Sequence, residues 1–223
     1  MKAHVLGFPR IGVNRELKKS LEAYWSGLID QSALEKTGQE LRQRHWQAQQ
    51  AAGLDFVTVG DFAFYDHLLN HSLRFGVIPA RFGTEQSADN LDLSFRLARG
   101  RAPTGQDTHA CEMTKWFDTN YHYIVPELHA EQQFALSDTR LFNEVKEAQA
   151  LGHSVKVVLV GPLSYLWLSK CYGTEFDKLT LLERLLPVYA QLFSELMALG
   201  VTWIQVDEPI LCLDLPQTWQ SDR

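Results

Sequence analysis

The sequence has few cysteines and no long apolar run. Its three cysteines, Cys111, Cys171 and Cys212, are widely spaced and form no CxxC pair. Free thiols of a reducing compartment are therefore expected, rather than a disulfide framework. The most apolar stretch, Val155 to Leu168, is broken by Gly161-Pro162 and is too short to span a bilayer. No secretory signal is visible at the N-terminus, so we expect a cytoplasmic protein with no membrane partner.

Charge and composition are those of an ordinary globular protein. The 223 residues carry a formal net charge of -6, with 45% hydrophobic and 11% aromatic residues. This mild acidity argues against a general nucleic-acid surface. The length suits one or two domains and is sufficient to bury a useful core.

Short apolar segments alternate with segments of helical periodicity. We expect strands that end at Phe8, Val59, Val125, Val160 and Val206. We expect helices from Arg15, from Ser32 to Gly53, and over 63–75, 93–97, 141–151 and 181–199. Repeated strand–helix order predicts parallel strands with right-handed crossovers. A closed (β/α)₈ barrel needs eight strands and roughly 250 residues. The sequence therefore predicts an α/β fold of the TIM type, as an incomplete (β/α)₈ barrel.

Four residues carry local helix signals. Asn14 is a plausible N-cap for the first helix, and Ser32 with Glu35 has the spacing of a capping box at the start of the second. Pro187 lies early in the last long helix, where it either introduces a kink or marks the true first turn.

The first predicted strand-to-helix turn is basic. Met1 to Lys19 contains five basic residues and one acidic residue, Glu16, in a chain of net charge -6. Arg15 and Lys18 are three apart and share a helix face. Cations in a first turn oppose the helix dipole, so an anionic ligand is a reason to place them there. The alternative is a solvated basic face.

Several motifs occur in one order along the chain. They are Leu6–Gly12 with Arg15–Lys18, 59–62 with 65–67, 100–105, 112–123, Gly161-Pro162 and Asp207-Glu208-Pro209. Together they closely resemble the N-terminal part of cobalamin-independent methionine synthases, from about Leu6 to Leu215. That family is built from two facing (β/α)₈ barrels. It moves a methyl group from 5-methyltetrahydropteroyltri-L-glutamate to homocysteine.

The resemblance implies that the two barrels have different functions. Residues 1–223 would form part of an N-terminal barrel that binds the folate tail. Zinc, which activates homocysteine, would be bound by a C-terminal barrel that this chain lacks, so no metal is expected here. Partners would be the triglutamate folate and that second barrel. The fragment alone would be inactive, and its open sheet would favour self-association.

The resemblance also assigns residues to the folate tail. Carboxylates of the three glutamates suit recognition by arginine and lysine. The family match places the tail against Asn14, Arg15, Glu16, Leu17, Lys18 and Lys115. Without the match, Lys115 among aromatic residues would be read as a solvent-reaching surface lysine.

Two other groups of residues are candidates for a catalytic site. His109-Ala110-Cys111 resembles the His-x-Cys pair of the family's zinc site, but it follows a loop and lacks a third ligand. Asp207-Glu208-Pro209 ends a strand, where an acid/base pair could lie, although adjacent side chains point to opposite faces. For Asp61 and Asp66, turn and capping roles are expected. The rival functions are a non-catalytic barrel scaffold and a barrel glycoside hydrolase that uses Glu208.

Overall fold

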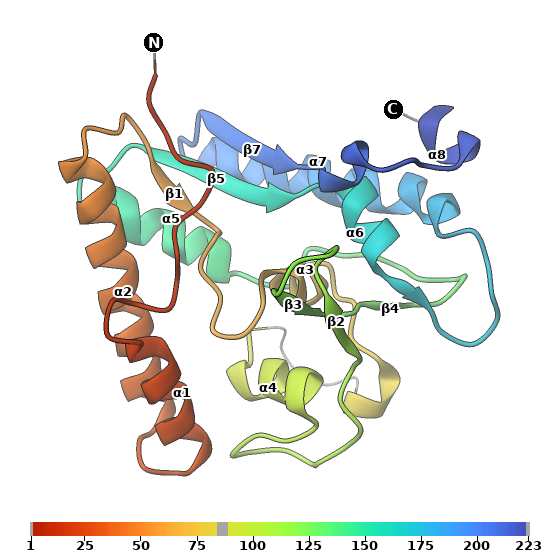
Figure 1. The fold of residues 1–223 in the computed structure, drawn as a ribbon, viewed down its shortest axis with the longest axis horizontal. Coiled ribbons are helices and arrows are strands. Elements are labelled where there is room, and N and C mark those ends of the chain that lie inside the picture. Colours follow the sequence, from red (N-terminus) through yellow and green to blue (C-terminus); the bar gives the residue numbers. More distant parts are fainter. Residues whose placement is uncertain (1, 84–88, 222–223) are drawn as a thin grey trace.

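The computed structural model describes residues 2–83 and 89–221. Its main sheet has three parallel strands in the order β1-β5-β7 (Figure 1). The strands are β1 (Val57–Val59), β5 (Val155–Val160) and β7 (Trp203–Asp207). The expected α/β class with parallel strands is therefore confirmed, whereas the described strands do not form a closed barrel.

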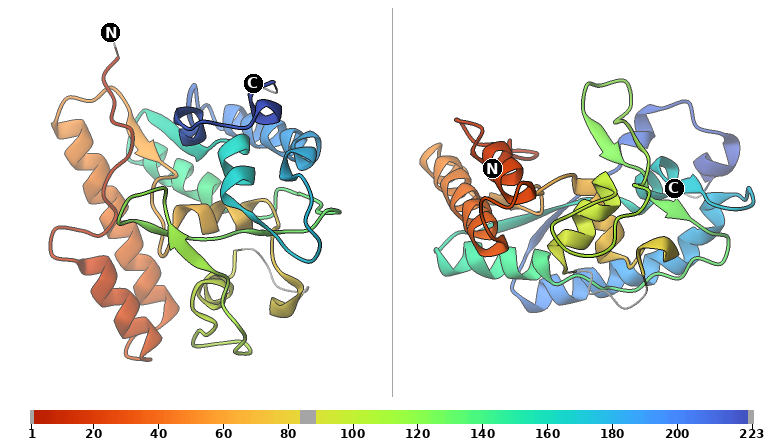
Figure 2. Two further views of the ribbon diagram at one scale, coloured as in Figure 1. Left: turned by 45° about the vertical axis from the view of Figure 1, so that its right-hand side comes forward. Right: turned by 90° about the horizontal axis from the view of Figure 1, so that it is seen from below.

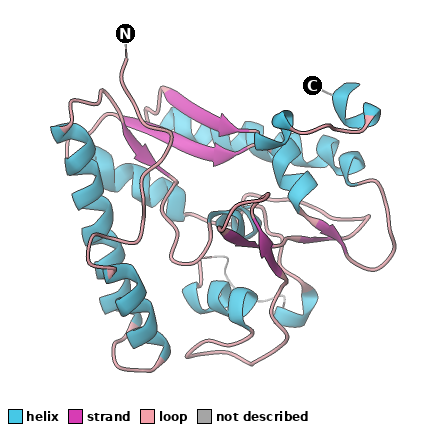
Figure 3. Cartoon of the chain, in the orientation of Figure 1, coloured by secondary structure: helices cyan, strands magenta, loops and turns pink. Residues whose placement is uncertain are grey.

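The described residues form eight α-helices, and Figure 3 shows the distribution of helix and strand. They are α1 (Glu16–Trp25), α2 (Gln31–Ala51), α3 (His67–Arg74), α4 (Leu91–Arg99), α5 (Arg140–Ala150), α6 (Pro162–Leu168), α7 (Leu182–Ala198) and α8 (Gln217–Ser221). Pro187 lies inside α7 rather than in its first turn. The start of α2 corrects the expected capping box, because the Asp30 carboxylate accepts from the Ala33 N–H and caps the helix.

Two small sheets complete the strands that the structure describes. β2 (Met113–Lys115) pairs antiparallel with β3 (His122–Ile124), and β4 (Glu127–Leu128) pairs in parallel with β6 (Lys170–Cys171). The expectation that the strand near Val125 joins the parallel sheet is wrong. Only six residues separate β2 from β3, so the nearby partner forms a hairpin at a small cost in loop-closure entropy.

The N-terminal segment passes beside the main sheet without joining its ladder (Figure 2). The Ala3 carbonyl accepts from the Asp55 N–H at 2.9 Å. Farther along, the Val5 carbonyl accepts from Lys156 Nζ and the Leu6 carbonyl accepts from Gln205 Nε2. The expected strand ending at Phe8 is therefore wrong, because side chains take the carbonyls that a strand would give to a neighbouring backbone.

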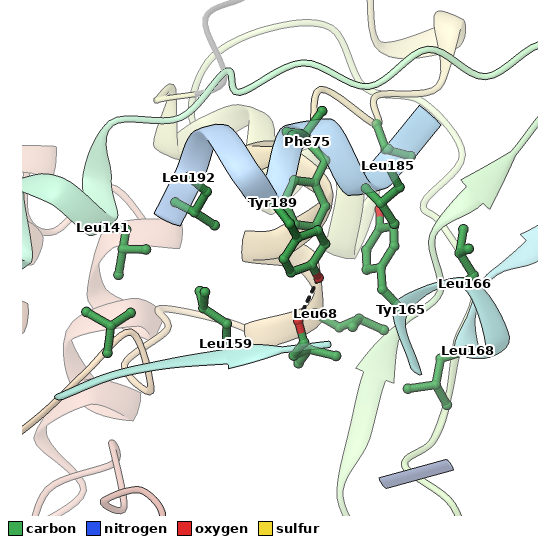
Figure 4. Close-up of a cluster of buried hydrophobic side chains, with 14 of the residues drawn as sticks. Leu68, Phe75, Leu141, Leu159, Tyr165, Leu166, Leu168, Leu185, Tyr189 and Leu192 are labelled. Atoms are coloured by element: carbon green, nitrogen blue, oxygen red, sulfur yellow. Dashed lines mark hydrogen bonds between the residues drawn. The ribbon is translucent and has the colours of Figure 1, made fainter. Parts of the chain in front are cut away.

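The main core lies between the sheet and α3, α6 and α7. The Phe75 ring meets Tyr165 edge to face and Tyr189 at a tilt, with ring centroids 5.3 and 5.0 Å apart (Figure 4). The Tyr189 hydroxyl donates to the Val160 carbonyl at 2.6 Å, which satisfies both buried polar groups. This packing fixes the carboxyl end of β5.

Candidate functional site

The basic turn has an unusual backbone. Arg15 is the N-cap residue of α1 in the left-handed conformation, with φ 60° and ψ 37°, and no side chain caps the helix. Its N–H donates to the Gly12 carbonyl at 3.0 Å, and the Leu17 N–H donates to the Ile11 carbonyl at 3.2 Å. Asn14 as N-cap is therefore wrong. Non-glycine residues rarely adopt this conformation, so the position of Arg15 has a conformational cost.

Glu16 holds the turn together. Its carboxylate accepts from the Asn14 N–H at 2.9 Å and from Arg44 Nη2 of α2 at 2.8 Å. Hydrogen bonds from its own N–H and from Arg44 lower the pKa of Glu16. A carboxylate engaged in this way would repel another carboxylate, so the geometry makes Glu16 a positioning residue.

The remaining residues of the turn divide into one core anchor and two exposed cations. Leu17 is 1% exposed and packs with Leu21 in the cluster between α1 and α2. The Lys18 ammonium lies 3.6 Å from Glu22, one helical turn away, in a solvent-exposed pair. The exposed Arg15 guanidinium has neither a hydrogen bond nor an ion pair with the described residues. Arg15 and Lys18 are thus available to an external anion.

Lys115 ends β2 and is exposed at the base of the hairpin loop. Its ammonium makes no hydrogen bond or ion pair with residues 2–83 or 89–221. Arg15 and Lys18 lie at the start of α1, whereas Lys115 lies on β2, so the exposed cations come from two different elements.

Arg10 connects the N-terminal segment to the loop between β2 and β3. It was not among the predicted site residues. Its guanidinium donates to the Tyr65 carbonyl and to the Tyr121 hydroxyl, and it lies 5.8 Å from the centre of the Tyr121 ring. The Tyr121 hydroxyl donates in turn to Asp66 at 3.1 Å. Burial raises the pKa of Tyr121 to about 12, so the hydroxyl keeps its proton. No local feature of the sequence pairs Arg10 with Tyr121, because the two residues lie 111 positions apart.

The ends of the parallel strands surround a cavity of about 360 Å³ beside the N-terminal segment. Asp61 accepts from the Phe8 N–H at 2.7 Å, and Asp66 caps α3 by accepting from the Leu69 N–H at 2.8 Å. Asp66 therefore has the capping role expected for it, whereas Asp61 holds the N-terminal segment, 53 residues away in the sequence, against the end of β1.

Glu208 also binds backbone N–H groups at this end of the sheet. Its carboxylate accepts from the Leu163 and Ser164 N–H groups, at 3.0 and 2.7 Å, at the start of α6. Gly161 leaves room for it, since a Cβ there would lie 2.1 Å from the carboxylate. Asp207 accepts from Gln205. The geometry makes Glu208 a helix cap rather than half of an acid/base pair.

The described residues offer no metal centre at His109-Ala110-Cys111. The thiol of Cys111 is buried, and burial raises its pKa to about 12. Arg81 Nη2 lies 3.5 Å from its sulfur. Within residues 2–83 and 89–221, no three His, Cys, Asp or Glu side chains are grouped to hold a metal ion. In the same part of the chain, no helix is both long and apolar enough to cross a membrane.

Comparison with known proteins identifies the family. Residues 2–222 match the family model described as the N-terminal domain of cobalamin-independent synthase. The chain belongs to this family. It is 57% identical over 216 residues to the 5-methyltetrahydropteroyltriglutamate–homocysteine methyltransferase of Serratia proteamaculans (strain 568), covering 97% of the chain and 28% of the relative. The methyltransferase of the same name from Proteus mirabilis (strain HI4320) is 57% identical over 221 residues, covering 99% of the chain and 29% of the relative.

The chain therefore spans less than a third of the length of these relatives. The family match extends over the basic turn, the hairpin with Lys115 and the strand ends. The surface with exposed cations thus belongs to the N-terminal domain of the family.

Proposed function

We propose that this chain is the N-terminal part of a 5-methyltetrahydropteroyltriglutamate–homocysteine methyltransferase and that it binds the glutamate tail of the folate. The observation that carries the proposal is the 57% identity to methyltransferases of that name across almost the whole chain. The full protein would make methionine by transferring the folate's methyl group to homocysteine. The free thiols of all three cysteines agree with a cytoplasmic location.

The exposed cations suit the tail. Its glutamates carry several carboxylates along a flexible chain, and Arg15 adopts a costly backbone conformation while its guanidinium has no partner among the described residues. Glu16 and Leu17 fix the turn from within, and Lys18 extends the positive surface along α1. Lys115 would then bind a carboxylate farther along the same tail. Charge-assisted contacts of this kind are among the stronger hydrogen bonds in proteins.

We also infer that the parallel sheet is part of a (β/α)₈ barrel that continues beyond the described strands. Supporting this, β7 is an edge strand with one free side, and its Trp203 and Val206 side chains are 46% and 41% exposed. A parallel strand is normally covered on both faces and both sides. One more strand beside β7 would satisfy this condition.

The methyl-transfer step would lie outside this chain. The zinc that the resemblance implies does not fit the residues described here, because they offer no suitable group of ligands. The chain's own contribution would be to bind and orient the tail. A second barrel would supply the reacting groups, and contact with it would complete the folate site.

The proposal is tested by the ratio of the Kd values for triglutamate and monoglutamate folate, measured on the full-length protein. Arg15→Ala or Lys18→Ala should weaken triglutamate binding by roughly tenfold or more, since a charge-assisted contact contributes on the order of 1.5–3 kcal/mol. Monoglutamate binding should change little. The loss should shrink as salt rises, because the surface is open to solvent.

Lys146→Ala is a matched control. Lys146 is an exposed lysine on α5, away from the basic turn and the hairpin, so its loss changes the net charge equally and should leave the ratio unchanged. If Arg15→Ala weakens the binding of both folates equally, the basic turn does not recognise the glutamate tail. If no variant of the turn or of Lys115 affects either folate, the domain acts as a scaffold instead.

A further inference from the structure

A second cavity, of about 570 Å³, lies between α2, α3 and α5. Its walls include Arg42, Arg74, Glu144 and Glu147. None of these side chains belongs to the proposed folate surface. Small-molecule sites have volumes of roughly 300–1,000 Å³. This cavity falls within that range, and most of the side chains that line it are polar or charged.

Arg74 is the most unusual group in the wall. Its side chain comes from the last turn of α3, and the residue is 3% exposed. Its Nε and Nη1 atoms are buried and have no hydrogen-bond partner. Asp138 is the main opposite charge acting on it, but that carboxylate is bound to the Arg140 guanidinium and N–H at 2.7–3.2 Å. Two buried guanidinium nitrogens without a hydrogen-bond partner are unfavourable, so an acceptor from outside the described chain would stabilise them.

The same cavity contains an unsatisfied acceptor. Glu147 Oε2 accepts from Arg42 Nε and Nη2 at 3.1 and 2.6 Å. Its Oε1 atom is buried and has no partner. Glu144 lies one helical turn earlier, with its carboxylate 3.8 Å from Arg42. Both carboxylates thus share a single guanidinium.

Glu144 lies within electrostatic range of both Arg74 and Glu147. Burial raises the pKa of Glu144 to about 7, and Arg42 and Arg74 oppose that rise while Glu147 adds to it. A simple anion that approached Arg74 would meet this pair of glutamates. A simple cation that approached the glutamates would meet Arg74. A ligand that carries an anionic group and a cationic group on the same carbon atom satisfies the two sides at once.

We propose that this cavity binds a zwitterionic α-amino acid. Its carboxylate accepts from the Arg74 guanidinium, and its ammonium group donates to Glu147 and Glu144. Phe62, Phe64 and Leu141 supply an apolar wall for the side chain of the amino acid. Phe62 and Phe64 meet edge to face with ring centroids 5.3 Å apart, so this part of the wall is rigid. The site is separate from the folate-tail surface and does not depend on its assignment.

The experiment is calorimetric titration of the full-length protein with each of the standard L-amino acids. The tightest binder is then compared with its decarboxylated and deaminated analogues. At least one amino acid should bind saturably, and both analogues should bind at least tenfold more weakly. A crystal structure with the same amino acid should show it bonded to Arg74, which separates this site from any other amino-acid site of the protein.

Arg74→Leu and Glu147→Gln should each weaken this binding at least tenfold. Arg74→Leu removes a buried charge in favour of an apolar side chain, so the variant should fold, and circular dichroism checks this. Lys146→Ala, on the outer face of α5, should leave binding unchanged. The proposal is overturned if no amino acid binds, if Arg74→Leu and Glu147→Gln both bind like the wild type, or if the deaminated acid binds as well as the amino acid. Electron density for water alone at Arg74 would also overturn it.

Discussion

The carboxylate of Glu16 lies 2.8 Å from Arg44 Nη2, so the first turn of α1 is tied to the middle of α2. The pair is partly exposed, with 27% of the Glu16 side chain and 47% of the Arg44 side chain accessible. The same carboxylate also accepts from the Asn14 N–H. A single side chain therefore holds both the shape of the basic turn and its position against α2.

We expect Glu16→Gln to lower the free energy of unfolding at neutral pH. Hydrogen bonds from its own N–H and from Arg44 lower the pKa of Glu16 in the folded protein below the ordinary 4.5. A carboxylate whose pKa is lowered by folding stabilises the folded protein at pH values above its pKa in the unfolded state. This stabilisation is lost as the pH falls through the pKa of the folded state. The difference between wild type and Glu16→Gln should therefore shrink in acid.

Urea unfolding at pH 7, 5 and 3 measures this difference. Glu22→Gln is the control, since Glu22 lies on the exposed face of the same helix and forms, among the residues that the structure describes, a single ion pair, a 3.6 Å surface contact with Lys18. It should change stability little at any of the three pH values. A difference for Glu16→Gln that stays constant from pH 7 to 3 would show that its carboxylate charge does not stabilise the turn.

Arg15→Gly should stabilise the protein while weakening its binding of the triglutamate folate. Arg15 has φ 60°, a conformation that costs a non-glycine residue on the order of 1 kcal/mol. Glycine relieves this cost, although part of the gain is offset by its greater entropy in the unfolded chain. Arg15→Ala removes the same charge and retains the strain, so it should not stabilise. Thermal unfolding of the two variants separates the effect of backbone strain from the effect of the lost charge. A lower Tm for Arg15→Gly than for Arg15→Ala would show that the left-handed backbone of Arg15 does not destabilise the protein.

Long, regular elements were predictable from the sequence. The expected helix over 181–199 and the expected strand ending at Val160 correspond to α7 (Leu182–Ala198) and β5 (Val155–Val160). In both, a sustained apolar pattern faces a core that buries it. The hairpin of β2 and β3 was not predictable, because its register depends on a short local pairing that the apolar pattern does not encode. The short helix α6 was also missed, since its start depends on Glu208, more than forty residues away.

The candidate site was predictable only in part. Exposed cations that oppose the helix dipole are visible in sequence, and Arg15 and Lys18 are indeed exposed on α1 or at its start. The contact between Arg10 and Tyr121 joins residues 111 positions apart, and nothing local predicts it. The left-handed backbone of Arg15 was unexpected as well, because glycine and asparagine are the residues that usually adopt it.

The isolated chain should self-associate through β7. This strand forms one edge of the parallel sheet, and it exposes Trp203 and Val206. Unpaired edge strands with exposed apolar side chains are templates for pairing with another chain. Light scattering across a concentration series should show a mass that rises with concentration. Val206→Lys should reduce the effect, because a charge on an edge strand opposes pairing. Leu151→Lys, at a similarly exposed position that follows α5, should not. A monomer at all concentrations would show that the edge is already protected.

The chain alone should produce no methionine from homocysteine and the triglutamate folate, even with zinc added. A free thiol has a pKa of about 8.5 and is mostly protonated at neutral pH, and a coordinating metal is what would deprotonate it. The described residues present no group of ligands for such a metal. The exposed cations Arg15 and Lys18 cannot replace it, because water screens charges at an open surface. The measurement is methionine formed above a blank without protein. Adding the remaining part of the full-length protein as a separate chain should restore turnover if the two parts associate, and turnover by the chain alone would place the chemistry in this domain.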